Sequence, residues 1–122
     1  MSLNQVINEL INEDPNVGAI AVLKLDGTLL FQTDNWDISA DIQNIINASK
    51  GGSSIIIQGV KYMIVENTPE RIIGTNVQGQ GHIIIAPFKT GFLVTYIIPQ
   101  VGPRDALFNV QNSAQKLNKI PI

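Results

Sequence analysis

Side chains that could do chemistry are sparse in this chain. His82 is its only histidine, and it contains no cysteine. A serine–histidine–aspartate triad would need His82 as its base, although that residue begins a predicted strand. Metal sites need several ligands that converge at a recognisable spacing, and one histidine with dispersed carboxylates does not supply it. The sequence therefore predicts no catalytic centre, no metal site and no cofactor.

A glycine-rich segment at residues 74–81 invites comparison with a phosphate-binding loop. It carries three glycines, Gly74, Gly79 and Gly81. The segment lacks the Gly-Lys-Ser/Thr ending of such loops, and it precedes a predicted strand where a phosphate loop precedes a helix. We therefore predict that it is a flexible connector.

Length, composition and charge narrow the class of protein further. The chain has 122 residues, of which 44% are hydrophobic and 15% charged, which indicates one folded domain over residues 1–122. Eight basic and ten acidic residues are scattered without a run, so no nucleic-acid footprint is present. A phosphoinositide site would need Lys61, Arg71 and Lys89 to cluster in the fold, which leaves that interaction open. No signal segment or transmembrane run is found, which predicts a cytoplasmic protein.

The first third of the chain is predicted to form a helix, a hairpin and a second helix. Ser2 and Gln5 make a capping box, and apolar residues then recur at helical spacing to about Asn12. Asp26-Gly27 separates two apolar runs and is among the strongest hairpin signals. Ser39 is expected to cap the next helix, and Trp36 to anchor that helix to the sheet.

The middle of the chain is predicted to form an antiparallel meander. Gln58-Gly59 separates two apolar runs that should pair as a hairpin. Further strands are expected at residues 71–73 and 82–86, followed by a turn at Pro87–Thr90. The run 92–98 is almost continuously hydrophobic, which is typical of a central strand covered on both faces.

A helix closes the chain, with Leu107, Val110, Ala114 and Leu117 at helical spacing. Helices at both ends and a single sheet predict an α+β fold. We expect an α/β/α sandwich around an antiparallel meander of about six to seven strands, with the terminal helices on one face.

Several short motifs in this order resemble the profilin family, and in particular the divergent profilins of Asgard archaea. They are Leu25-Asp26-Gly27 followed by Trp36, the run Gly59–Val65, Ile72-Ile73-Gly74, the loop that closes at Gly79-Gln80-Gly81, Lys89-Thr90 and Leu93–Tyr96. The resemblance implies a cytoskeleton-associated protein that binds actin monomers, regulates filament assembly and has no catalytic activity.

The resemblance also implies which residues contact actin, on the later meander strands and the start of the last helix. In many profilins lysines stand where this chain has Thr75 and Asn76. Carried over by position, the actin-binding face would comprise Ile64, Glu66, Arg71, Thr75, Asn76, His82, Val101, Gly102, Arg104, Asp105 and Phe108.

A second family site binds polyproline between aromatic side chains of the terminal helices and the first hairpin. Here the equivalent positions hold Leu3, Val6 and Leu30, and the last helix has no Tyr, Trp or His. The helical period of Leu3 and Val6 favours core packing over an apolar groove. We therefore predict that polyproline binding is weak or absent.

Two other classes share parts of this plan. A roadblock or longin-like scaffold for small GTPases or motors also begins with a helix and an Asp-Gly hairpin, but commonly ends sooner than a chain that continues with a strand and a long helix. A PAS-like sensor would require a ligand cavity.

Overall fold

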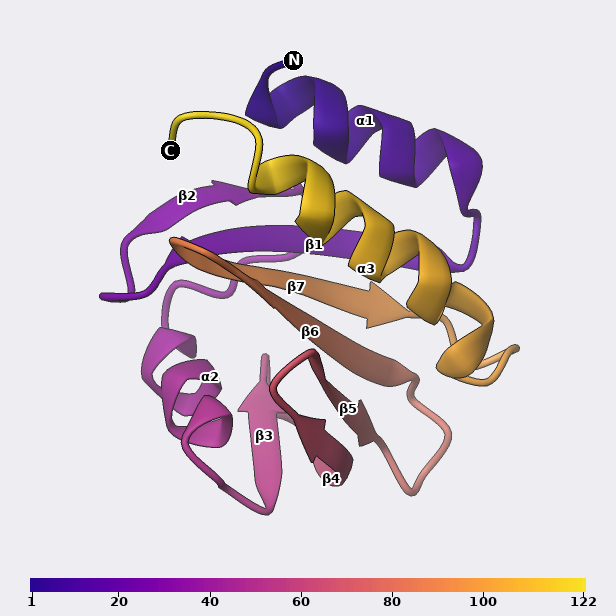
Figure 1. Cartoon of the computed structure of the whole chain (residues 1–122). Coiled ribbons are helices and arrows are strands. Elements are labelled where there is room, and N and C mark those ends of the chain that lie inside the picture. Colours follow the sequence, from indigo (N-terminus) through magenta and orange to yellow (C-terminus); the bar gives the residue numbers. More distant parts are fainter.

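The computed structural model describes residues 1–122, and its centre is one seven-stranded antiparallel sheet (Figure 1). The strands lie in the order β2-β1-β7-β6-β5-β4-β3. In chain order the elements are α1 (Leu3–Glu13), β1 (Val17–Lys24), β2 (Leu29–Gln32), α2 (Ile42–Ser49), β3 (Ser54–Ile57), β4 (Val60–Thr68), β5 (Arg71–Thr75), β6 (His82–Phe88), β7 (Gly91–Ile97) and α3 (Arg104–Leu117).

The chain path explains this strand order. β1 and β2 form the hairpin predicted at Asp26-Gly27, and α2 then carries the chain to the far edge of the sheet. From β3 the strands meander back, each antiparallel to the one before, until β7 pairs with β1. The predicted meander is confirmed, and β7 lies inside the sheet between β1 and β6.

Two apolar cores lie on opposite faces of the sheet. The first joins α1 and α3 to the sheet, and Val6, Ile20, Leu93 and Val110 belong to it. The second lies under α2 and contains Trp36. Figure 1 shows α1 and α3 side by side on one face and α2 on the other. The predicted α/β/α sandwich with both terminal helices on one face is therefore confirmed.

Trp36 lies between α2 and the sheet, as predicted. Only 5% of its surface is exposed, and it shares a core with Ile45 of α2 and Ala21 of β1. The predicted cap at Ser39 is wrong, because α2 begins at Ile42 after Asp41. The Asp37 carboxylate accepts hydrogen bonds from the backbone N–H and the hydroxyl of Ser39, so Ser39 completes a turn before the helix.

Two strands are longer than the sequence predicted. Pro87 was expected in a turn, but it lies in β6 opposite Phe92 of β7. The strand tolerates it there because β5, which begins at Arg71, does not reach that far: its pairing with β6 extends only to Ile72 with Ile85. Gly74 was expected to open a loop, but it lies within β5, where an added Cβ would stand 3.1 Å from the Cβ of Tyr62.

Candidate partner-binding face

The terminal helices cover only part of the sheet face on which they lie. α1 packs on β1, and α3 packs on β6 and β7. β4 and β5 extend beyond the two helices (Figure 1). Some of the side chains that β4 and β5 direct to this face, such as Met63, therefore remain exposed.

The strand register identifies which side chains share the uncovered face. Met63 pairs with Thr75, Thr75 with His82, and His82 with Ile97. Directly opposed residues in antiparallel strands point to the same side. Since Ile97 belongs to the core under α1 and α3, Met63, Thr75 and His82 also face that side.

A β-bulge in β4 changes this pattern after Met63. Ile64 pairs with Gly74, whereas Glu66 pairs with Ile73, so Val65 is the extra residue. Met63 and Glu66 consequently share the uncovered face, while Ile64 points to the other face and packs against the core under α2. The expectation that Ile64 and Glu66 share one binding face is therefore wrong. Met63, which is 38% exposed, takes the place assigned to Ile64.

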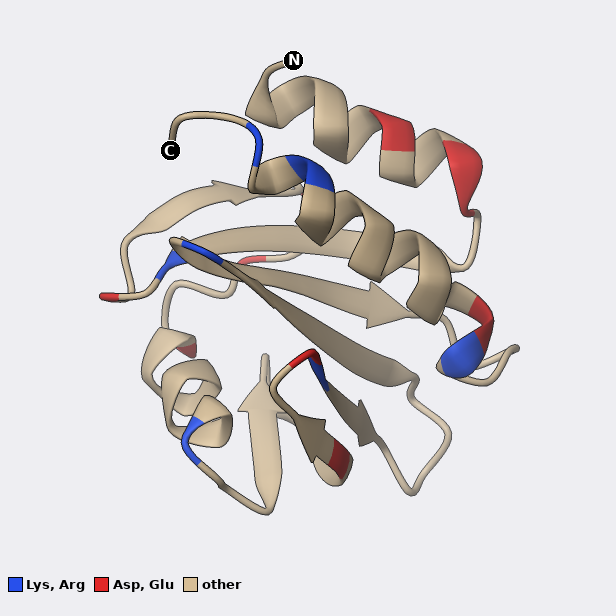
Figure 2. Ribbon diagram, in the orientation of Figure 1, with Lys and Arg blue, Asp and Glu red and all other residues tan.

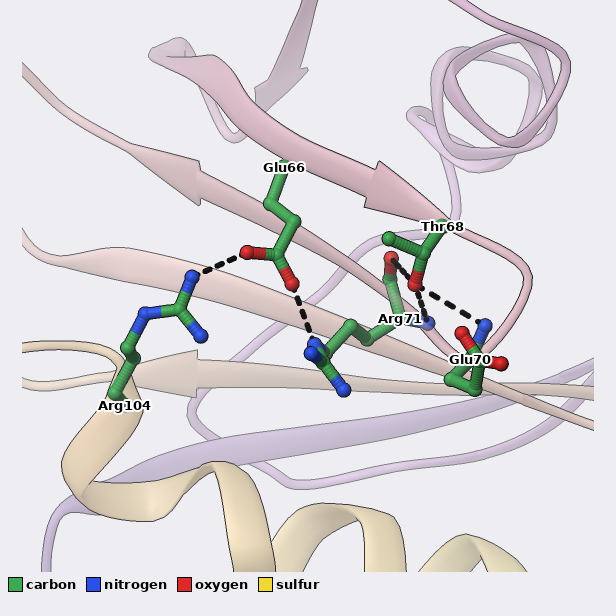
Figure 3. A network of polar contacts seen from close by, with 5 residues as sticks. All are labelled: Glu66, Thr68, Glu70, Arg71 and Arg104. Carbon is green, nitrogen blue, oxygen red and sulfur yellow. Dashed lines mark hydrogen bonds and ion pairs between the residues drawn. The ribbon is translucent and has the colours of Figure 1, made fainter.

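Glu66 is the centre of a charge cluster that links the strands to α3 (Figure 3). Its Oε2 accepts a hydrogen bond from Arg71 Nε at 2.5 Å, and its Oε1 accepts one from Arg104 Nη2. The guanidinium of Arg71, and next that of Arg104, hold the pKa of the Glu66 carboxyl below its usual range. The Arg104 side chain is still 61% exposed, so it can contact a partner while paired.

The turn between β4 and β5 fixes the position of Arg71. Thr68 Oγ1 accepts hydrogen bonds from the backbone N–H groups of Glu70 and Arg71, both at 3.3 Å (Figure 3). Arg71 then begins β5 opposite Thr68. Its guanidinium therefore reaches Glu66 from a fixed point of the sheet.

His82 ties the strands to the segment that precedes α3. Its Nε2 donates to the carbonyl of Val101 at 2.8 Å, and Thr75 Oγ1 lies 3.1 Å from its Nδ1. Both ring nitrogens are thus used within the protein. His82 has a positioning role here, and Val101 packs partly against the core.

The first turns of α3 carry the most exposed part of the face. Asp105 Oδ2 accepts a hydrogen bond from the Gly102 N–H at 3.2 Å, which ties the segment before α3 to the first turn of the helix. Phe108 follows Arg104 by one turn, so their side chains lie on one helix face. Phe108 is 78% exposed and stands out as an aromatic ring that the fold does not use.

Asn76 lies inside the loop between β5 and β6, at 8% exposure. Its side-chain Nδ2 donates to the carbonyl of Lys61 at 2.8 Å. Its Oδ1 accepts from the backbone N–H groups of Gln78 and Gln80 at 2.8 and 3.1 Å. The loop predicted as a flexible connector is thus held by Asn76, whose side chain is buried and bonded within the protein.

The equivalents of the polyproline site lie in or against the core. Val6 is 1% exposed and Leu3 packs at the edge of the same core, as their helical spacing led us to expect. Leu30 of the hairpin also packs against this core. Phe108 is the one aromatic residue of α3. The terminal helices are also joined by an ion pair between Lys116 Nζ and Glu9 Oε2 at 3.0 Å.

Charged residues are interspersed over the molecule, as the blue and red segments of Figure 2 show. Lys61 lies near the start of β4, whereas Arg71 lies opposite Thr68 at its end. Seven residues of strand separate these positions by roughly 20 Å. Lys61 and Arg71 therefore do not form a shared basic patch. None of the helices combines the length and the hydrophobicity that spanning a bilayer requires.

Together, the fold and the exposed face define a small partner-binding protein with the α/β/α plan. The chain belongs to the profilin family, whose model, described as "Profilin", matches residues 1–121. Loki profilin-1 from Lokiarchaeum sp. (strain GC14_75) is 46% identical over 126 residues, covering 94% of each chain. The crystal structure of LokiProfilin1 superposes with a TM-score of 0.92 at 45% identity, over 99% of this chain and all of that one. The profilin of the solved "LokiProfilin2/Rabbit Actin Complex" gives a TM-score of 0.90 at 45% identity, over 99% of this chain and 100% of that one.

Proposed function

We propose that this profilin-family protein binds actin monomers and regulates filament assembly, without catalysing a reaction. The observation that carries the proposal is the similarity, over 99% of the chain, to a profilin solved in complex with rabbit actin. The same similarity favours this function over the scaffold and sensor alternatives. In this proposal residues 1–122 act as a single domain in the cytoplasm, in association with the cytoskeleton.

The binding face is proposed to combine an exposed aromatic anchor with a charged border. Phe108 would bury its ring in a pocket of the partner, since aromatic residues and arginines contribute most to interface energies. Arg104 would pair with an acidic group of actin while Glu66 and Arg71 hold it in position. The face then consists of Met63, Glu66, Arg71, Thr75, His82, Val101, Gly102, Arg104, Asp105 and Phe108, and it omits Ile64 and Asn76.

Assembly of pyrene-labelled actin tests the proposal. We expect excess protein to suppress spontaneous nucleation of rabbit or archaeal actin, and Phe108→Ala to weaken monomer binding at least tenfold. Leu25→Ala is a matched control, because Leu25 is also an exposed apolar residue, at 54%, but lies by the β1–β2 turn. If saturating protein changes neither nucleation nor elongation with either actin, the proposed function is wrong.

A further inference from the structure

A cavity of about 460 Å³ lies on the α2 side of the sheet. Its walls come from β1, β7, the connection between β2 and α2, the β3–β4 hairpin and the loop that contains Gln80. This volume falls within the usual range of small-molecule sites. Tyr62 lines the cavity, whereas its neighbour Met63 faces the opposite side of β4, so the cavity is separate from the proposed actin face.

Two buried side chains present unused hydrogen-bonding groups to this cavity. Tyr62 is 3% and Trp36 5% exposed. The side-chain hydrogen bonds of the cavity walls are made by Asn35 and Tyr96, and neither the Tyr62 hydroxyl nor the Trp36 indole N–H takes part in one. No side-chain nitrogen or oxygen that is fully shielded lacks a partner, so both of these atoms are reached from open space. The cavity is the open space that both residues line.

The second tyrosine of the cavity differs from the first. Tyr96 donates its hydroxyl to the carbonyl of Gln80 at 2.9 Å, and its ring lies 6.4 Å from that of Trp36 at a tilt of 52°. Gly18 lies beneath the Tyr96 ring, where an added Cβ would stand 3.1 Å from it. The two rings are therefore a fixed aromatic wall, and Tyr96 has already used its hydroxyl.

The cavity carries no charge. None of its ten lining residues is acidic or basic, and their polar groups are hydroxyls, the indole N–H and the amides of Asn35, Gln58 and Gln80. Burial raises the pKa of Tyr62 to about 12, so its hydroxyl stays a donor at neutral pH. A charged ligand would lose water here without gaining a counter-ion, whereas a neutral ring would not.

We propose that this cavity binds a small uncharged heteroaromatic molecule of the nucleobase or nucleoside class. Its ring would pack against Trp36 and Tyr96, and a polar edge would accept a hydrogen bond from the Tyr62 hydroxyl. Aromatic walls combined with amide and hydroxyl groups are the means by which proteins hold unpaired bases. The amide groups of Gln58 and Gln80 at the rim supply both donors and acceptors.

Trp36 is the only tryptophan of the chain, so its fluorescence reports occupancy directly. The probes are adenosine, guanosine, cytidine and uridine, each with its 5′-monophosphate. We expect saturable quenching by at least one nucleoside and no tighter binding by its monophosphate. Tyr62→Phe removes only the unused hydroxyl and should weaken binding roughly five- to tenfold. Tyr96→Phe, the matched control, removes a hydroxyl that is already bonded and should change affinity less than about twofold.

The proposal is overturned if no nucleoside gives a saturable signal up to its solubility limit. It is also overturned if a monophosphate binds more tightly than its nucleoside, or if Tyr62→Phe binds as the parent does. Thermal unfolding of both variants checks that each is folded. Actin assembly is not part of the readout, so the result is independent of the proposed function.

Discussion

One face of the sheet contains two regions that differ in whether helices cover them. Over β1, β6 and β7 the terminal helices lie on the sheet, and Val6 and Leu10 are each 1% exposed. Beside them lie β4, β5 and the first turns of α3, and Phe108 in these turns is 78% exposed. We call these the covered half and the uncovered half. Both halves lie on the same side of the sheet. The extent of the sheet that the helices cover therefore decides which side chains are buried in the core and which lie at the surface.

The two halves also use charge differently. In the covered half the Glu9–Lys116 ion pair joins two partly exposed helix surfaces, and such pairs contribute little to stability. In the uncovered half Glu66 accepts from two arginines and so fixes the direction of Arg104. Charge in the covered half accompanies apolar packing, whereas in the uncovered half it organises a surface.

The largest expected effect is a difference in stability between a substitution in the covered half and one in the uncovered half. Leu10→Ala should lower the free energy of unfolding by about 2–5 kcal/mol, because it leaves a cavity between α1, α3 and the sheet. Phe108→Ala should change this free energy by less than about 0.5 kcal/mol, because the exposed ring packs little against the rest of the protein. Chemical denaturation with urea measures both. A loss above about 2 kcal/mol for Phe108→Ala would mean that the ring belongs to the core.

Charge reversals in the two halves test which half binds the actin monomer. Arg104→Glu should weaken actin-monomer binding by about 1–3 kcal/mol, because it replaces a cation at the proposed interface and repels Glu66. Lys116→Glu makes the same change in the covered half, where it breaks the pair with Glu9, and should leave the affinity unchanged. Fluorescence anisotropy with labelled monomeric actin compares the two. Equal affinities for the parent and Arg104→Glu would place the binding face elsewhere.

The comparison also explains what the sequence could predict. The covered half follows from periodicity: the apolar spacing of Leu3–Glu13 and of Leu107, Val110, Ala114 and Leu117 is a local pattern that requires burial. The pairing of β1 with β2 and of β3 with β4 likewise follows from short turns at Asp26-Gly27 and Gln58-Gly59. These signals lie within a few residues of each other, so they can be recognised without a structure.

The uncovered half could be predicted only in part. The family resemblance placed Glu66, Arg71 and Arg104 in one region, and they form one cluster. The bulge at Val65 has no signal in the sequence, because it depends on how β4 pairs with β5. The positions carried over from the family resemblance therefore included Ile64 and left out Met63. The structural role of Asn76 was hidden for a similar reason, since its partners include the distant carbonyl of Lys61.

A proline-rich peptide tests whether the covered half has any accessible groove. Polyproline binds to aromatic faces with donors that reach its carbonyls, and Leu3, Val6 and Leu30 provide neither. Each carbonyl buried without a donor would cost roughly 1–3 kcal/mol, so we expect no binding of decaproline by calorimetry. Micromolar affinity centred on Leu3 and α3 would contradict the expectation, and would show that an aliphatic surface can hold the peptide.

The smallest expected effect concerns the protonation of Glu66 in the uncovered half. The pKa of its carboxyl lies below the ordinary value of 4.5 because Arg71, and then Arg104, favour the charged form. A lowered folded-state pKa means that the stabilisation is fully present above pH 4.5 and is lost as pH falls through the lower folded value. Titration of the Glu66 carboxyl carbon by NMR measures this pKa directly.

Arginine replacements then assign the cause. Arg71→Gln should raise the Glu66 pKa further than Arg104→Gln, because Arg71 is the larger cause and its side chain is 28% exposed against 61% for Arg104. The double variant should return the pKa to the ordinary carboxyl range, which removes the low-pH step in stability. A parent pKa at or above 4.5 would mean that the two guanidinium groups do not hold Glu66 in solution. Arg104 would then be free to reorient, and the uncovered half would lose the one contact that aims a cation at its partner.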